Sequence, residues 1–124
     1  MISKNLASIR DKIFVICQRL GREPSEIVLV GVTKYAEPPK IKEALEAGLT
    51  DIGENRVRDA REKFVQLEDT LPGITKHMLG HLQTNKVKDA IELFDLIQSV
   101  DSLKLVEEIE KQADKKRKVI DILL

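Results

Sequence analysis

The sequence predicts an α/β domain built on a parallel sheet, and three observations support this fold class. Strand-like apolar runs alternate with amphipathic segments along the 124 residues, which is typical of parallel strands joined by helical crossovers. The run from Ile27 to Val32 is unbroken, as in a strand buried on both faces. No glycine-rich phosphate-binding motif follows it, although an open dinucleotide-binding sheet would place one there. The pattern is compatible with two architectures, an open doubly wound sheet or a (β/α) barrel.

The first two elements are expected to be a helix and the strand that ends in Lys34. Residues 3–20 carry apolar side chains at helical spacing, and Gly21 is expected to end this amphipathic helix. Its apolar stripe includes the single cysteine, Cys17, which we interpret as a small buried residue rather than a nucleophile. The strand is expected over residues 27–34. Because side chains alternate across a strand, one face carries Val28, Val30, Val32 and Lys34.

The remaining elements continue the alternation. Pro38 and Pro39 begin a helix that ends near Gly48. Thr84 is the expected N-cap of one later helix, and Asp101 or Ser102 that of another. Further strands are expected at 51–55, 77–81, 96–100 and 119–124. Eight such units need a longer chain, so a barrel would be present only in part and truncated in its fifth strand.

Composition limits the classes of partner. The 21 basic and 21 acidic residues balance to a net charge of zero, so no overall field favours nucleic acid or an anionic membrane. No apolar run approaches the roughly 20 residues of a membrane span, and the N-terminus lacks the apolar region of a signal peptide. We expect a cytoplasmic protein that binds neither nucleic acid nor membrane.

Lys34 is the first candidate for chemistry, because parallel sheets carry their sites at the carboxyl ends of strands. In one interpretation its ammonium extends from the rim of the sheet into water and pairs with Glu37 or Glu54. In the other interpretation its amine is a nucleophile that forms a Schiff base, as lysines do with carbonyl compounds. The pattern alone favours the ion pair.

Polar residues near the later strand ends also have competing structural and functional interpretations. Asn55 either caps the helix that starts at Arg56 or faces a ligand. His77 is interpreted as a packed strand histidine. A metal site formed by His77 and His81 is disfavoured, because four residues of strand separate them by about 13 Å. The run of residues 84–86 at a helix start could hold an anion, although capping alone explains it.

Three motifs in order carry a resemblance to a known family. They are V-G-V-T-K at 30–34, D-I-G-E-N-R-V at 51–57 and H-M-L-G-H-L-Q-T-N-K at 77–86. With the segments 97–101 and 119–124, they resemble the YggS-type pyridoxal phosphate homeostasis proteins, which are related to the barrel domain of alanine racemase. The resemblance covers nearly the whole chain.

This resemblance implies a fold-type III, (β/α)8 TIM barrel that binds pyridoxal 5′-phosphate (PLP). Residues 1–124 would be its N-terminal part, with a leading helix and about five strands, and so an incomplete barrel domain. Lys34 matches the lysine that holds PLP as an internal aldimine. Asn55, at the end of the second strand, and His81, ending the third, match positions at the cofactor mouth.

The resemblance also implies a function in PLP binding and homeostasis without catalytic turnover. Such a carrier would deliver PLP to apoenzymes, and the full-length protein would be a monomer. The family's phosphate-binding loops follow the seventh and eighth strands, beyond these residues. One alternative is a PLP-dependent amino-acid racemase that uses Lys34 as acid and base. The other is a truncated chain that self-associates and has no independent function.

Overall fold

The computed structural model describes residues 1–124 and is built around one wholly parallel sheet of five strands. The strands are β1 (Val30–Val32), β2 (Asp51–Glu54), β3 (Thr75–Met78), β4 (Leu96–Ile97) and β5 (Asp121–Ile122). Their spatial order follows the sequence, β1-β2-β3-β4-β5. A doubly wound sheet reverses its strand order at a switch point, whereas the strands of a barrel follow one another in sequence order. The observed order contains no reversal, so the arrangement is that of a barrel.

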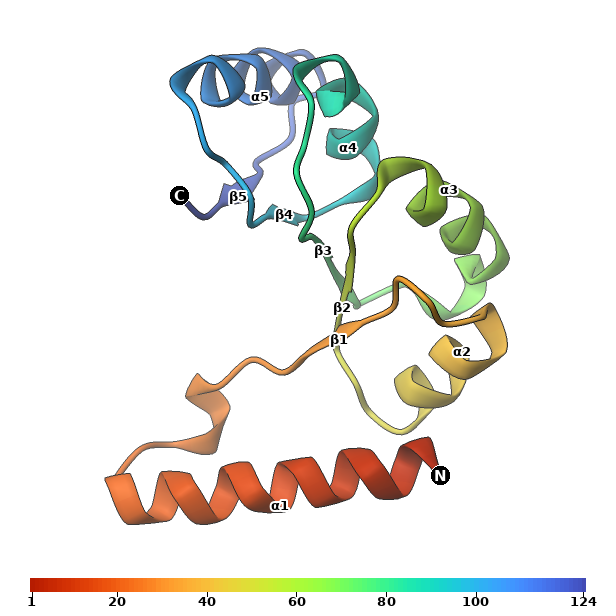
Figure 1. Ribbon diagram of the computed structural model, residues 1–124, viewed down its shortest axis with the longest axis vertical. Helices are drawn as coiled ribbons and strands as arrows, with labels where there is room; N and C mark the ends of the chain where they lie inside the picture. The colour runs from red at the N-terminus through yellow and green to blue at the C-terminus, as the bar shows by residue number, and fades with distance from the viewer.

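The four helices that connect the strands lie on one side of this sheet. Helices α2 to α5 follow its outer side one after another, and α1 lies across its end beside α2 (Figure 1). None of the helices combines the length and the apolar character needed to cross a membrane. The helices are α1 (Ile2–Leu20), α2 (Pro38–Glu46), α3 (Val57–Gln66), α4 (Val87–Leu93) and α5 (Leu103–Lys115), and the 3-10 turns are η1 (Pro24–Glu26), η2 (Glu68–Thr70) and η3 (Thr84–Lys86).

Local sequence signals explain several helix ends. Gly21 adopts a left-handed backbone with φ 68° directly after α1, and Gly48 has φ 97° after α2. Ser102 caps α5, since its Oγ accepts a hydrogen bond from the Leu105 N–H at 3.2 Å. The N-cap prediction for Thr84 is wrong. This residue begins η3, and α4 starts at Val87 without a side-chain cap, because a 3-10 turn continues directly into the helix.

A single apolar core fills the space between the sheet and the helices. Ile52, Phe94 and Ile97 are completely buried there. The Phe94 ring meets the Phe64 ring edge-on, with centroids 5.7 Å apart. Cys17 is buried, as predicted for a packing residue.

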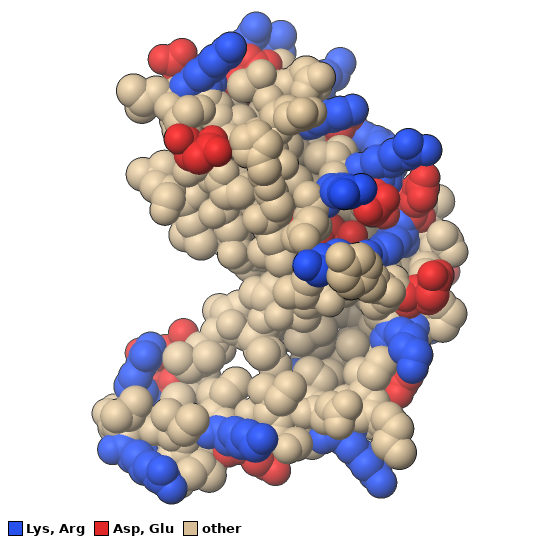
Figure 2. Space-filling model, in the orientation of Figure 1, with Lys and Arg blue, Asp and Glu red and all other residues tan.

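The opposite face of the sheet is open, so the prediction of a strand buried on both faces is wrong. Val28 and Val32 are 61% and 56% exposed, and paired strand is limited to Val30–Val32 instead of residues 27–34. The reason is that all the crossover helices lie on the other face (Figure 1). Figure 2 shows this face as a hollow with few charges at its centre, whereas charged side chains gather on the convex side.

Candidate functional site

Lys34 lies two residues beyond β1, in a tight turn. The carbonyl of Thr33 accepts a hydrogen bond from the Ala36 N–H at 3.0 Å, so Lys34 and Tyr35 occupy the two central positions of the turn. The Lys34 Nζ lies 5.1 Å from the centroid of the exposed Tyr35 ring. It forms no hydrogen bond or ion pair in the structure. The expected pairing of Lys34 with Glu37 or Glu54 is therefore not formed.

The carboxylate of Glu54 is instead paired with Lys63 in a buried network beneath the turn. Glu54 is completely buried and Lys63 on α3 is 15% exposed, and their Nζ–Oε2 distance is 3.1 Å. The Thr33 hydroxyl also donates to Glu54. Lys63 further donates to the main-chain carbonyls of Thr33, at 2.6 Å, and Lys34, at 3.1 Å.

Lys63 was missed at the sequence level, although a signal was present. The inward residues of α3 include Ala60, and Lys63 lies three residues later, next to Ala60 on the helix surface. A lysine at the border of a buried stripe, in the helix after a strand that ends in a carboxylate, is a candidate for a buried ion pair. Helical periodicity alone assigns it to the charged outer surface.

Asn55 and His81 come together in a shallow depression next to β2 and β3. Its volume is about 380 Å³, and the cationic side chains of Arg56, Arg58 and Lys86 also line it. Asn55 does not cap α3, because the N-cap position belongs to Arg56 and no side-chain cap is formed. Lys34 does not line this depression, although it follows the strand paired with β2.

His81 lies in the loop after β3, so the prediction that it ends the strand is wrong. β3 ends at Met78, where pairing with β4 stops at Ile97. The His81 side chain is 68% exposed, and its Nδ1 lies 3.3 Å from the Asp101 carboxylate. The loop is held by the Ser99 hydroxyl, which donates a hydrogen bond to the Gly80 carbonyl at 2.6 Å.

His77 is a packed strand histidine, as predicted. It is 5% exposed and lies on the open face of the sheet, opposite the core residues of β3. Its Nε2 is 2.8 Å from Asp51 Oδ2, and its Nδ1 is 2.9 Å from Gln98 Nε2. The amide of Gln98 donates to Nδ1, so the Nε2 hydrogen points to Asp51. Both ring nitrogens of His77 are therefore engaged in hydrogen bonds within the sheet.

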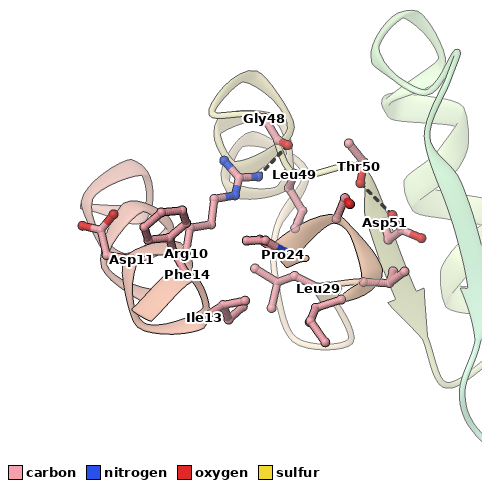
Figure 3. Close-up of a pocket in the computed structure, with 13 residues that line it drawn as sticks. Arg10, Asp11, Ile13, Phe14, Pro24, Leu29, Gly48, Leu49, Thr50 and Asp51 are labelled. Atoms are coloured by element: carbon pink, nitrogen blue, oxygen red, sulfur yellow. Dashed lines mark hydrogen bonds between the residues drawn. The ribbon is translucent and has the colours of Figure 1, made fainter. Parts of the chain in front are cut away.

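A larger hollow lies at the other end of the sheet. About 600 Å³ of space separates α1 from the segments that precede β1 and β2 (Figure 3). The Arg10 guanidinium bridges this region by donating to the Gly48 carbonyl at 2.6 Å. Apolar side chains such as Ile13, Phe14 and Leu29 line much of the rest. Because α/β barrels carry their chemistry at the carboxyl edge, we place the candidate site around Lys34 and not in this hollow.

Fold and site together define a class: part of a (β/α) barrel with an unpaired lysine amine at the carboxyl edge of its first strand. No family model matches the chain. Over 124 residues it is 33% identical to the pyridoxal phosphate homeostasis protein of Escherichia coli K12, covering 99% of this chain and 53% of the relative. The protein of that name from Aquifex aeolicus is 36% identical, covering 98% and 52%. The chain thus spans about half the length of the curated relatives it matches.

Solved structures agree with the sequence comparison. PipY of Synechococcus elongatus PCC7942 with PLP bound aligns with a TM-score of 0.86 and 38% identity, covering all of this chain and 53% of PipY. PipY without PLP aligns with a TM-score of 0.84. The resemblance predicted from the motifs is confirmed: the chain matches the N-terminal half of these PLP-related barrel proteins.

Proposed function

We propose that this chain binds PLP through Lys34 and belongs to a protein of PLP homeostasis. The observation that carries the proposal is the Lys34 amine, which lies at the carboxyl edge of the sheet without a carboxylate partner. An amine engaged in an ion pair is held protonated and is a poor nucleophile. The names of the relatives and the PLP in PipY support the choice of ligand.

The residues at this edge suit the proposed ligand. Bound PLP supplies an aldehyde that a lysine amine can attack and a ring that withdraws electrons. Lys34 provides the amine, and the open face beside β1 leaves room for a flat aromatic ring. We further propose that Asn55 and His81 lie at the mouth of the site, since they share the depression beside β2 and β3.

We propose a carrier rather than an enzyme, active in the cytoplasm as a full-length monomer that passes PLP to apoenzymes. Racemisation needs a second acid or base beside the substrate. Both nitrogens of His77 are hydrogen-bonded within the sheet. His81 is exposed and faces Asp101. Neither histidine is a ready partner for Lys34.

Covalent attachment is tested by incubating the chain with PLP, reducing with borohydride and mapping the modified peptide. We expect the pyridoxyl group on Lys34 and its loss in Lys34→Ala. A matched control is Lys42→Ala, which removes an exposed lysine from α2. Modification restricted to surface lysines such as Lys88 would show that Lys34 does not bind the cofactor.

The carrier role is tested separately. PLP-loaded protein is incubated with single L-amino acids, and racemisation and decarboxylation are compared with free PLP at equal concentration. We expect no excess over free PLP, together with activation of a PLP-dependent apoenzyme. Sustained turnover that disappears in Lys34→Ala would favour a racemase-like enzyme instead.

A further inference from the structure

We infer that Lys63 is a positioning residue for Lys34, because its buried ammonium fixes the turn that carries the cofactor-binding amine. The role of that amine rests on the proposed function, whereas the contacts of Lys63 do not. Lys63 comes from α3, which follows β2, and it reaches the end of the neighbouring strand β1. It therefore connects two strand–helix units at the carboxyl edge.

The geometry accounts for every proton of the ammonium. A lysine ammonium has three N–H donors. Nζ of Lys63 lies 2.6 Å from the carbonyl oxygen of Thr33, 3.1 Å from that of Lys34, and 3.1 Å from Glu54 Oε2. Three acceptor groups thus match three donors, and two of the three are main-chain atoms of the turn.

Neutralising Glu54 does not explain this arrangement by itself. The shortest contact of Nζ is to the Thr33 carbonyl and not to the carboxylate. That same carbonyl also accepts the Ala36 N–H at 3.0 Å, so its two lone pairs are used by the turn and by Lys63. Since Thr33, the first residue after β1, is fixed in this way, the backbone direction at Lys34 is fixed as well.

The consequence concerns the amine of Lys34. Its backbone carbonyl is held by Lys63, while its side chain extends freely over Tyr35. Removing the donors of Lys63 releases both carbonyls and allows the turn to open. The amine then samples more positions, and its reaction with an aldehyde held at the site becomes less selective.

Four variants separate positioning from stability. Lys63→Met removes the charge and the donors at similar length, and Lys63→Arg keeps the charge and several donors. The double variant Glu54→Gln/Lys63→Met removes both members of the buried pair, which avoids an uncompensated buried charge. Lys42→Met is the matched control, because Lys42 forms only an exposed pair with Glu46.

Two readouts are measured on the whole 124-residue chain at equal concentration. The first is hydrogen exchange of the Ala36 amide, which reports opening of the turn and needs no cofactor. The second is the share of pyridoxyl label on Lys34 relative to surface lysines after treatment with PLP and borohydride. Loss of charge-assisted hydrogen bonds predicts changes of about tenfold in both readouts for Lys63→Met. We expect Lys63→Arg to retain most of the wild-type values and Lys42→Met to retain all of them.

The double variant decides the question. We expect it to regain thermal stability relative to Lys63→Met, yet to keep fast exchange at Ala36 and a low label on Lys34. If both readouts recover together with stability, Lys63 is only a structural partner of Glu54 and the inference is wrong. Unchanged exchange and label in Lys63→Met would also overturn it. A wild-type chain that takes no label on Lys34 contradicts the proposed function instead, and Ala36 exchange then still decides whether Lys63 holds the turn.

Discussion

The two faces of the sheet differ in almost every physical respect. On the helix side, Ile52 and Ile97 are completely buried among side chains of the crossover helices. On the opposite side, Val28 and Val32 are more than half exposed, and His77 forms hydrogen bonds with a residue of β2 and with the residue that directly follows β4. The first face holds the fold together, whereas the second lies open beside the carboxyl edge at which Lys34 follows β1.

This difference indicates which face of the sheet stabilises the fold. Burial of apolar area stabilises the helix face at about 25 cal/mol per Å². The open face contributes little by the same measure, because its valines remain in water. Substitutions on the two faces should therefore have very different effects on folding, and the predictions below follow from this contrast.

The largest effect is expected from Phe94→Ala on the buried face. Phe94 is completely buried and packs edge-on against Phe64, so its truncation should lower the free energy of unfolding by about 3–5 kcal/mol. Val32→Ala on the open face is the comparison, with an expected change within about 0.5 kcal/mol. Urea unfolding followed by circular dichroism measures both, and equal losses would show that the open face is also packed in solution.

A second effect concerns association through the open face. An exposed strand edge and an apolar surface promote self-association, so we expect the chain to form oligomers or aggregates. The double substitution Val28→Lys/Val32→Lys should shift sedimentation toward the monomer. Val65→Lys is the matched control, because Val65 is 69% exposed but lies on α3 on the convex side. A wild-type chain that sediments as a monomer with cooperative unfolding would contradict this account.

Periodicity and turn residues predicted most of the fold correctly. The alternation of strands and helices, the helix ends at Gly21 and Gly48, and the cap at Ser102 are all confirmed. These features depend on local rules of backbone geometry and capping. Right-handed crossovers are compatible with both a doubly wound sheet and a barrel, and the observed order of the strands decides between them.

The exposure of strand residues and the partners of ion pairs could not be predicted from local sequence rules. The apolar run at Val28–Val32 has the same pattern whether or not a second layer covers it, so its exposure depends on what lies opposite. The pairing of Glu54 with Lys63 instead of Lys34 depends on the approach of α3 to the end of β1, which is a tertiary distance. The position of His81 beyond β3 reflects where pairing with β4 stops.

The smallest effect is expected for an ion pair on the convex side. Lys116 beside Glu92, with help from Arg61, lowers the pKa of the Glu92 carboxyl below its ordinary value of 4.5. A lowered folded-state pKa contributes stability that is present above the unfolded pKa and is lost as pH falls through the folded pKa. Glu92→Gln should therefore slightly lower the unfolding midpoint at pH 7. The difference should shrink as the pH falls through the lowered pKa of the Glu92 carboxyl, and an undiminished difference in acid would show that the charge is not responsible.

The most direct test of the central proposal compares PLP with 5′-deoxypyridoxal, which keeps the aldehyde and lacks the phosphate. We propose that these 124 residues provide the attachment at Lys34, while the phosphate site lies outside them. Absorbance titration of the wild-type chain should then give weak binding with similar affinity for both compounds, and Lys34→Ala should abolish it for both. Micromolar or tighter binding of PLP with a preference above about tenfold, or roughly 1.4 kcal/mol, would contradict the account, because it would place a phosphate site within this half of the barrel.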